Sequence, residues 1–305
     1  MKRKGNFPPS LRAGDTIGIV APASVVEKDY IENTEKALKD LGYRVQMGDN
    51  IFKENNQFAG TDAERLADFQ KFLDNKEIKA LFCARGGYGS VRIAGSADFS
   101  GFRRNPKWLA GFSDITVFHT LINRHYHIPT LHAPMPVNFS DTYFDKNLRQ
   151  LDAILKGEKP LLKLNGNTLN KQGRAKGKIT GGNLSILYSL QATPFEIKTK
   201  DTILFIEDVG EQLYHLDRMM QNLLLSGKLK NLRGLVVGGM TDMQDKKRPF
   251  GKTAYEVIAD TVKGFNFPVA FDFPAGHIEN NIPFILGAEA ELEVDKSNGV
   301  TIQYC

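Results

Sequence analysis

Three residues in this sequence have the types and settings needed for nucleophilic hydrolysis, beginning with Ser113. Ser113 follows the apolar run Trp108–Phe112 and precedes a helical pattern, so we expect it at a strand-to-helix turn. There the hydroxyl can point out of a sheet, while free N–H groups of the helix N-terminus face a developing oxyanion. The alternative is that Ser113 only caps the helix, as serine often does.

His277 and Glu207 could supply the base and the group that orients it. His277 lies in the polar loop Pro274–Asn281, and Glu207 follows the predicted strand Thr202–Ile206. A buried carboxylate there could hold a histidine in the right tautomer and stabilise its cation. Alternatively, His277 is an ordinary solvated loop residue, and Glu207 caps the next helix or pairs with Arg218.

A glycine-rich stretch, Arg85–Ser90, ends the predicted strand Lys79–Ala84. Its three glycines allow the backbone to approach a ligand closely and to aim N–H groups at it, although a plain tight turn is the alternative. A phosphate-binding P-loop is disfavoured because no Lys followed by Ser or Thr comes after the last glycine. A dinucleotide fingerprint is disfavoured because the first predicted strand-to-helix turn, Ala21–Ser24, contains no glycine. The G-x-S-x-G elbow of α/β hydrolases also fails, because Ile115 stands at its second glycine.

The histidines and cysteines predict neither a metal nor another cofactor. His-x-x-x-His, His-Glu-x-x-His and Cys-x-x-Cys spacings are all missing from the sequence. The two cysteines are Cys83, in an apolar run, and the final residue, Cys305. A disulfide framework is therefore not expected, in agreement with a reducing compartment.

The elements that must position these residues follow a βαβ pattern in the first half of the chain. Short apolar runs alternate with amphipathic segments, which predicts an α/β fold with an open, mostly parallel sheet flanked by helices. The strands are expected at Thr16–Ala21, Arg44–Met47, Lys79–Ala84 and Trp108–Phe112, and helices at Glu27–Leu41, from Thr61, from Asp114 and at Lys146–Leu155.

A change in composition divides the chain. Residues 156–177 are rich in Lys, Gly and Asn, so we predict an N-terminal α/β domain at 1–156, a linker at 157–176 and a C-terminal domain at 177–305. The C-terminal domain is expected to contain helices at Asn183–Leu190 and Gln212–Leu225, strands at Thr202–Ile206 and Gly234–Gly238, and a final hairpin turning at Asn298-Gly299.

Composition narrows the classes of partner. The chain has 305 residues, 41% of them hydrophobic, and a net charge of +5 from scattered Lys and Arg, so nucleic acid is not the expected partner. No apolar run approaches the roughly 20 residues of a membrane span, and the N-terminal residues lack the pattern of a secretion signal. We therefore expect a cytoplasmic protein without a membrane partner.

Several motifs, in their residues and in their order along the chain, resemble those of the LD-carboxypeptidase family of serine peptidases. This family includes muramoyltetrapeptide carboxypeptidases and the related microcin C immunity proteins. The resemblance covers nearly the whole chain. Its motifs are Gly14–Pro22, Ala84–Gly89, Gly111–Thr116, Gly181–Leu184, Glu207-Asp208, Gly276-His277 and Asn281. One departure is Pro283 followed by Phe284–Leu286, where family members commonly carry a Leu-Pro pair shortly before the glycine that matches Gly287.

The resemblance implies roles for the residues that match. Ser113 is implied as the nucleophile, His277 as the general base and Glu207 as the orienting carboxylate. The oxyanion hole would consist of backbone N–H groups of the Gly86-Gly87 turn and of Asp114. Residues that we expect to contact substrate are Arg85, Tyr88 and Asn183, and Arg85 is the candidate partner of a free carboxylate.

The resemblance also implies a C-terminal domain with a β-rich core, a homodimer, and release of terminal D-Ala from a murein peptide during peptidoglycan recycling. Two other functions stay open at this point. One is a microcin immunity type of peptidase that cuts an aminoacyl-nucleotide conjugate with the same three residues. The other is a peptide- or sugar-binding protein without catalytic activity.

Overall fold

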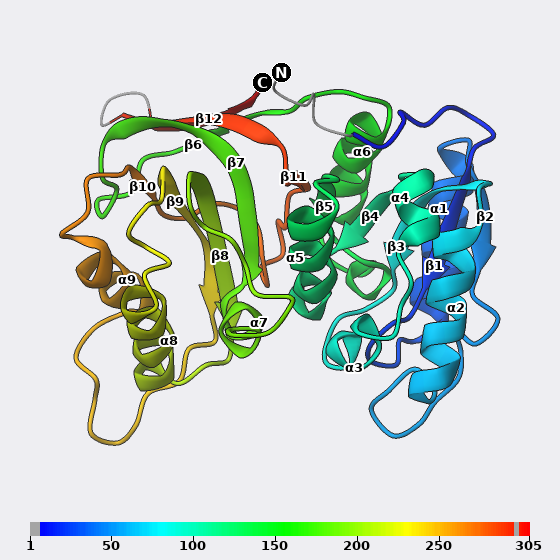
Figure 1. The fold of residues 1–305 in the computed structure, drawn as a ribbon, viewed down its shortest axis with the longest axis horizontal. Coiled ribbons are helices and arrows are strands. Elements are labelled where there is room, and N and C mark those ends of the chain that lie inside the picture. The colour runs from blue at the N-terminus through cyan, green and yellow to red at the C-terminus, as the bar shows by residue number, and fades with distance from the viewer. Residues whose placement is uncertain (1–6, 296–298) are drawn as a thin grey trace. The chain divides into compact units, whose positions relative to one another are not determined.

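The computed structural model describes residues 7–295 and 299–305, and the chain divides into two compact units. The first unit contains residues up to 158 together with 279–285, and the second contains 159–278 and the rest of the C-terminal part. The predicted α/β fold, with an open N-terminal sheet flanked by helices and a β-rich core in the C-terminal part, is confirmed (Figure 1). Each unit is described separately below.

The first unit is built on a six-stranded sheet in the order β11-β5-β4-β3-β1-β2. Neighbouring strands from β2 to β5 pair in parallel, as the βαβ pattern predicted. All five residues of β1 are buried, as expected of a central strand covered on both faces. The strands are β1 (Thr16–Val20), β2 (Arg44–Met47), β3 (Ile78–Cys83), β4 (Trp108–Gly111), β5 (Thr130–His132) and β11 (Phe284–Leu286).

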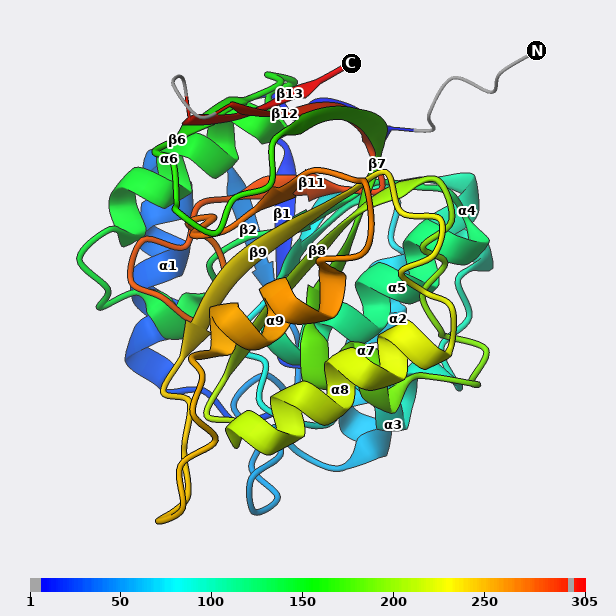
Figure 2. The same cartoon turned by 90° about the vertical axis from the view of Figure 1, so that its left-hand side faces the viewer.

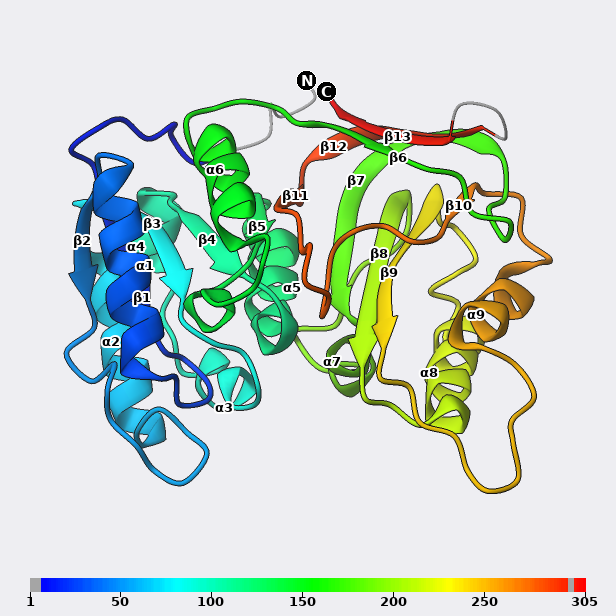
Figure 3. The same cartoon turned by 180° about the vertical axis from the view of Figure 1, so that it is seen from behind.

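Helices cover both faces of this sheet. In opposite views of the molecule, α2 lies in front of the sheet in one and α1 in the other (Figures 1 and 3). Thr61 and Glu64 form the predicted capping box at the start of α2. The helices are α1 (Lys28–Asp40), α2 (Asp62–Asp74), α3 (Ser90–Ala94), α4 (Ser100–Arg104), α5 (Thr116–His125) and α6 (Phe144–Leu155), with short 3-10 turns η1 (Ser113–Ile115) and η2 (Pro136–Asn138).

The parallel arrangement brings three connections to one edge of the sheet. Carboxyl ends of parallel strands lie at the same edge, which is where open α/β sheets place their ligands. The segments that follow β1, β3 and β4 therefore meet there. They contain Ser24, the Arg85–Ser90 stretch and Ser113 respectively.

The second unit contains a seven-stranded sheet in the order β10-β9-β8-β7-β12-β13-β6. Strands β7 to β10 pair in parallel, and β12, β13 and β6 extend the sheet with antiparallel pairs. The strands are β6 (Leu161–Leu164), β7 (Gly173–Asn183), β8 (Thr202–Val209), β9 (Gly234–Thr241), β10 (Val269–Ala270), β12 (Glu289–Asp295) and β13 (Gly299–Tyr304), and the helices are α7 (Leu184–Ser189), α8 (Leu213–Leu225) and α9 (Ala254–Val262).

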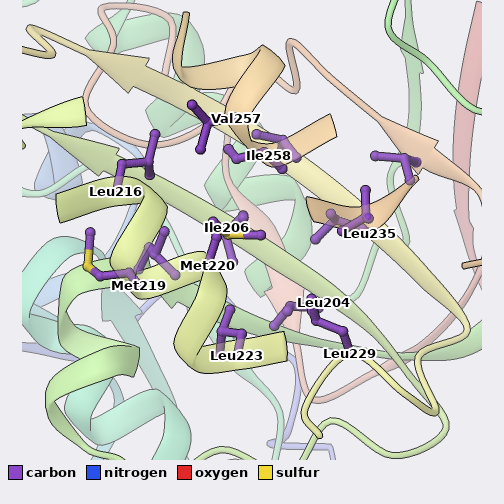
Figure 4. Close-up of a cluster of buried hydrophobic side chains, with 14 of the residues drawn as sticks. Leu204, Ile206, Leu216, Met219, Met220, Leu223, Leu229, Leu235, Val257 and Ile258 are labelled. Atoms are coloured by element: carbon purple, nitrogen blue, oxygen red, sulfur yellow. The ribbon is translucent and has the colours of Figure 1, made fainter. Parts of the chain in front are cut away.

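Helices α8 and α9 pack on one face of this sheet, and their apolar sides close its core (Figure 2). Figure 4 shows Met220 and Leu223 of α8 and Ile258 of α9 gathered over Ile206 of β8, all of them buried. This packing fixes β8, at whose carboxyl end Glu207 lies.

One segment differs from its sequence-based prediction, and another lies partly outside the residues that the structure describes. Residues 157–176, predicted as a linker, contain strand β6 and the first residues of β7, so they are part of the second sheet. Exposed and less exposed residues alternate along β6 and the first part of β7, as in other strands. The sequence analysis missed this pattern because the segment is rich in Lys and Gly. The predicted hairpin is confirmed as β12 and β13, while Asn298 of its turn lies outside the described residues. No helix among the described residues is long and apolar enough to cross a membrane.

Candidate active site

Ser113 occupies a strained backbone position directly after β4. Its φ angle is +62°, a left-handed conformation that costs a non-glycine residue on the order of 1–3 kcal/mol and that concentrates at functional sites. Ser113 is the first residue of η1 rather than its cap, since Phe112 occupies the cap position. Within this described segment, no side-chain hydrogen bond caps the N-terminus of η1 or of α5. The alternative that Ser113 only caps a helix therefore gains no support.

Gly86 lies so close to Ser113 that no larger residue fits. A Cβ atom placed on Gly86 would lie 2.8 Å from the Ser113 Cβ, 3.0 Å from its Oγ and 3.2 Å from the backbone N of Asp114. The backbone of the glycine-rich stretch therefore faces the nucleophile candidate. This is the close approach that an oxyanion hole made of main-chain N–H groups requires.

The loop Arg85–Ser90 is fixed by Ser24, from the segment after β1. The Ser24 N–H donates to the carbonyl of Gly86 at 3.1 Å, and the Ser24 Oγ accepts from the N–H of Tyr88 at 3.2 Å. Arg85 Nη1 donates to the carbonyl of Val25 at 2.9 Å. The loop and the first strand connection thus form one hydrogen-bonded structure.

Asp114 is buried beside the nucleophile candidate, and its side chain reaches the same loop. Its Oδ2 accepts the N–H of Ser90 at 2.7 Å. Burial raises the pKa of the Asp114 carboxyl, while hydrogen bonds from Ser90 and the charge of Arg65 oppose that rise. The residue therefore offers a backbone N–H next to Ser113 and uses its side chain to hold the loop.

Glu207 and His277 form a hydrogen-bonded pair in the second unit. The Oε2 of Glu207 lies 2.7 Å from His277 Nδ1 and also accepts the backbone N–H of His277 at 3.2 Å. Glu207 is fully buried, whereas the His277 side chain is 23% exposed. Gly276, at φ +112°, allows this approach, because a Cβ there would lie 2.6 Å from Glu207 Oε2. The pair fixes the imidazole with Nε2 pointing away from the carboxylate, as a general base needs.

The electrostatic effect of this pair favours a basic histidine. Burial disfavours the imidazolium, but the hydrogen bond and the negative charge of Glu207, with a smaller contribution from Asp208, outweigh it. The net result is a His277 pKa raised above its ordinary value. The capping alternative for Glu207 gains no support, because among the described residues no side-chain hydrogen bond caps the start of α8. The Arg218 alternative gains none either, because Arg218 lies over the ring of Tyr214.

Asp208 and Asn183 support the end of β8. Asn183 Nδ2 donates to Asp208 Oδ1 at 3.0 Å, and Asp208 Oδ2 accepts the N–H of Ser185 at 2.8 Å. Burial and the neighbouring charge of Glu207 raise the pKa of Asp208 to about 7. The Asn183 Oδ1 also caps α7 by accepting the N–H of Ile186 at 3.2 Å.

The remaining candidates fall into clear structural roles. Tyr88 is 44% exposed and lies against Phe58. His119 is a core histidine between Thr130 Oγ1 and the Gly111 carbonyl, and burial lowers its pKa to about 4. Of the predicted site residues, Ser113, Gly86, Gly87, Asp114, Arg85 and Tyr88 lie in the first unit, and Glu207, His277 and Asn183 lie in the second.

The sequence analysis assigned no supporting role to Arg65 or Ser24, and it named Asp208 only as a neighbour of Glu207 in a motif. Arg65 had a detectable signal, since it lies four residues before Phe69, on the face of α2 that carries the buried residues. A charged residue at a core position often has a specific partner. Among the described residues, no group of three or more His, Cys, Asp or Glu is arranged to hold a metal ion.

Two family models match this chain. Residues 17–133 match the LD-carboxypeptidase N-terminal domain and residues 176–292 match the LD-carboxypeptidase C-terminal domain. A probable murein peptide carboxypeptidase of Bacillus subtilis is 35% identical over 303 residues, which cover 96% of this chain and 93% of the relative.

Solved structures share the fold over nearly the whole chain. A muramoyltetrapeptide carboxypeptidase from Oxalobacter formigenes is 26% identical with a TM-score of 0.83, covering 95% of this chain and 98% of the other. The microcin C7 self immunity protein in its wild-type apo state is 20% identical with a TM-score of 0.85, covering 97% of each chain. The second likeness concerns the fold alone.

Proposed function

The chain belongs to the LD-carboxypeptidase family, and we propose that it is a serine carboxypeptidase that releases terminal D-Ala from murein tetrapeptide. The observation that carries the proposal is the buried Glu207 carboxylate hydrogen-bonded to His277 at 2.7 Å. Binding a peptide does not require such a pair, whereas activating a serine hydroxyl does. The strained backbone of Ser113 is the second support.

In the proposed reaction, Ser113 attacks the carbonyl carbon of an L-configured centre, such as that of diaminopimelate, which is bonded to terminal D-Ala. His277 takes the hydroxyl proton and then gives it to the nitrogen of the leaving D-Ala, so that an acyl-enzyme forms. Water activated by His277 then hydrolyses the ester and restores Ser113. The proposal requires that the imidazole and the hydroxyl meet in the working enzyme.

The proposed oxyanion hole consists of backbone N–H groups of the Gly86-Gly87 turn and of Asp114. The closeness of Gly86 to Ser113 supports it. Fixed N–H donors stabilise the negative charge that develops on the carbonyl oxygen, and losing one such donor typically costs on the order of 100-fold or more in rate. Glu207 would keep His277 in its tautomer and stabilise the imidazolium.

Substrate contacts are proposed for Arg85 and Tyr88, and an indirect role is proposed for Asn183. A guanidinium has five N–H donors, so the bond from Arg85 to Val25 leaves capacity for the free carboxylate of D-Ala. The exposed ring of Tyr88 could pack on the peptide. Asn183 would act by fixing the start of α7, since its amide is engaged with Asp208 and Ile186.

We also propose that the enzyme is cytoplasmic, acts on recycled murein fragments and works as a homodimer. Light scattering coupled to size-exclusion chromatography measures the oligomeric state, and cell fractionation measures the location. A monomer at micromolar concentration would contradict the proposed homodimer. Recovery of the protein outside the cytoplasm would contradict the proposed location.

Release of D-Ala from purified tetrapeptide tests the proposed function. We expect wild-type protein to release D-Ala, and Ser113→Ala protein to be inactive while retaining its fold. A fluorophosphonate probe should label Ser113. Wild-type activity in Ser113→Ala protein would overturn the proposal, and affinity for tetrapeptide without labelling or turnover would favour the binding-protein alternative.

A parallel assay with an aminoacyl-nucleotide conjugate addresses the immunity-type alternative. If the same Ser113-dependent protein cleaves that conjugate faster than tetrapeptide, as compared by kcat/KM, the substrate assignment is wrong while the catalytic assignment stands.

A further inference from the structure

We propose that Arg65 is a positioning residue for this reaction. Its buried guanidinium, together with the Asp114 carboxylate, would hold the Arg85–Ser90 loop against the nucleophile turn, which we define as Phe112–Ile115. The inference rests on the proposed function, because the loop matters through the oxyanion-binding N–H groups assigned to it.

The first observation is the set of acceptors around the Arg65 guanidinium. The Arg65 side chain rises from α2 and is fully buried. Its Nη1 donates to the carbonyl of Gly89 at 3.0 Å and to the carbonyl of Pro22 at 2.5 Å, and its Nη2 pairs with Asp62. One side chain therefore ties the end of the glycine-rich loop to the segment after β1.

The second observation is the contact between the nucleophile turn and the same end of the loop. Asp114 directly follows Ser113, and its Oδ2 accepts the N–H of Ser90 at 2.7 Å in a buried setting. Arg65 holds the loop at the carbonyl of Gly89, one residue before Ser90. The Arg65 cation, from α2, and the Asp114 carboxylate, from η1, thus bind neighbouring backbone groups of the loop.

The start of the loop is held as well, by hydrogen bonds between Ser24 and the backbone of Gly86 and Tyr88. Hydrogen bonds at both ends therefore oppose a shift of the loop relative to Ser113. Because the space between Gly86 and Ser113 is too small for a Cβ atom, a small movement of the loop would change the distance from the N–H donors to the reacting oxygen. Misplacement by about 1 Å can cost on the order of 100-fold in rate.

A purely stabilising role explains Arg65 less well. A buried guanidinium gives up its hydration, and this desolvation cost can exceed the Coulombic gain, so a buried ionic group is weak evidence for a purely stabilising role. Two of its three hydrogen-bond partners are backbone carbonyls, that of Gly89 in the loop and that of Pro22 in the segment after β1. The main effect of Arg65 is therefore to hold the carbonyls of Gly89 and Pro22 in position.

The test compares Arg65→Met, Arg65→Lys and Arg92→Met. Arg92 is the matched control, because its side chain also pairs with Asp62 and lies over the ring of Phe58, yet it is 46% exposed. For Arg65→Met we expect kcat on tetrapeptide to fall about 30- to 100-fold, with KM within about threefold of wild type. Arg65→Lys should give an intermediate kcat, and Arg92→Met should keep the wild-type kcat.

The rate of Ser113 labelling by a fluorophosphonate should fall in parallel with kcat, because that reaction also develops charge at the proposed hole. A wild-type kcat in Arg65→Met, or equal losses in Arg65→Met and Arg92→Met, would overturn the inference. If thermal melting shows that Arg65→Met is unfolded, Arg65→Lys decides: an approximately fivefold or larger kcat loss with unchanged KM supports the inference, and a wild-type kcat overturns it.

The two proposals fail separately. Ser113→Ala protein that still releases D-Ala would overturn the proposed function. An inactive Ser113→Ala variant beside a fully active Arg65→Met variant would overturn only the positioning role of Arg65.

Discussion

At the scale of single residues, the proposed chemistry depends on how Glu207 changes the basicity of His277. The carboxylate raises the pKa of the imidazole, so Glu207→Gln should lower it, since an amide has no negative charge and burial then dominates. The base must be neutral to accept a proton. The acid limb of the pH profile of kcat/KM should therefore move to lower pH, with kcat reduced by about 10³- to 10⁴-fold.

Glu211→Gln provides the control for this measurement, because Glu211 and His215 form a second carboxylate–histidine pair at 2.5 Å in the same unit. That variant should leave the acid limb where wild type has it. An acid limb that stays in place in Glu207→Gln would show that His277 is not the titrating base.

A second prediction at this scale concerns the space beside Ser113. Gly86→Ala would place a methyl group 3.0 Å from the Ser113 Oγ, so we expect at least a 100-fold loss of kcat with folding retained. Gly264→Ala is the control, since nothing lies within 4 Å of a Cβ at that position. Circular dichroism checks the fold and D-Ala release checks activity, and near-normal turnover by Gly86→Ala would argue against this loop as the oxyanion hole.

At the scale of elements, a buried lysine closes the end of α2. Lys107, in the segment just before β4, donates its Nζ to the carbonyls of Phe72 at 2.7 Å and Asn75 at 2.6 Å. Carbonyls at a helix C-terminus lack partners within the helix, so this side chain acts as a cap from outside. Burial lowers the pKa of Lys107 from 10.5 to about 8.

This shift predicts a pH dependence of stability. Between pH 8 and 10.5 the unfolded chain binds the Lys107 proton and the folded protein does not, so stability rises with pH. The free energy of unfolding of wild type, relative to Lys107→Met, should increase by up to about 3 kcal/mol across that window. Urea unfolding of both proteins at several pH values measures it, and Lys76→Met controls for loss of an exposed lysine. A difference that does not change with pH would contradict the prediction.

At the scale of the whole molecule, the proposed catalytic residues are divided between two compact units. If Ser113 and His277 act in one step, removing either should abolish that step, and removing the second should cost little more. We therefore expect Ser113→Ala, His277→Ala and the double variant to share one residual rate within about threefold. Multiplicative losses in the double variant would indicate two independent contributions and would contradict a shared mechanism.

The sequence predicted the local features of both units. The βαβ pattern, the capping box at Thr61 and the final hairpin arise from neighbouring residues, whose periodicity and turn chemistry are visible in the chain. The prediction that residues 157–176 form a linker was wrong, because the structure of this segment depends on residues that are distant in the sequence. Strand β6 is held by pairing with β13, which lies far away in the sequence.

For the site, local apolar patterns predicted the turn that carries Ser113 and a strand leading to Glu207. That strand was predicted to end at Ile206, whereas β8 includes Glu207 and continues to Val209. Three features depend on tertiary structure: Glu207 is buried against His277, a Cβ on Gly86 would clash with Ser113, and Arg65 donates to the Gly89 carbonyl. Each of these features joins residues 24 or more positions apart. Burial and hydrogen-bond geometry between such residues depend on how the strands and connections within each unit pack, and no local pattern encodes them.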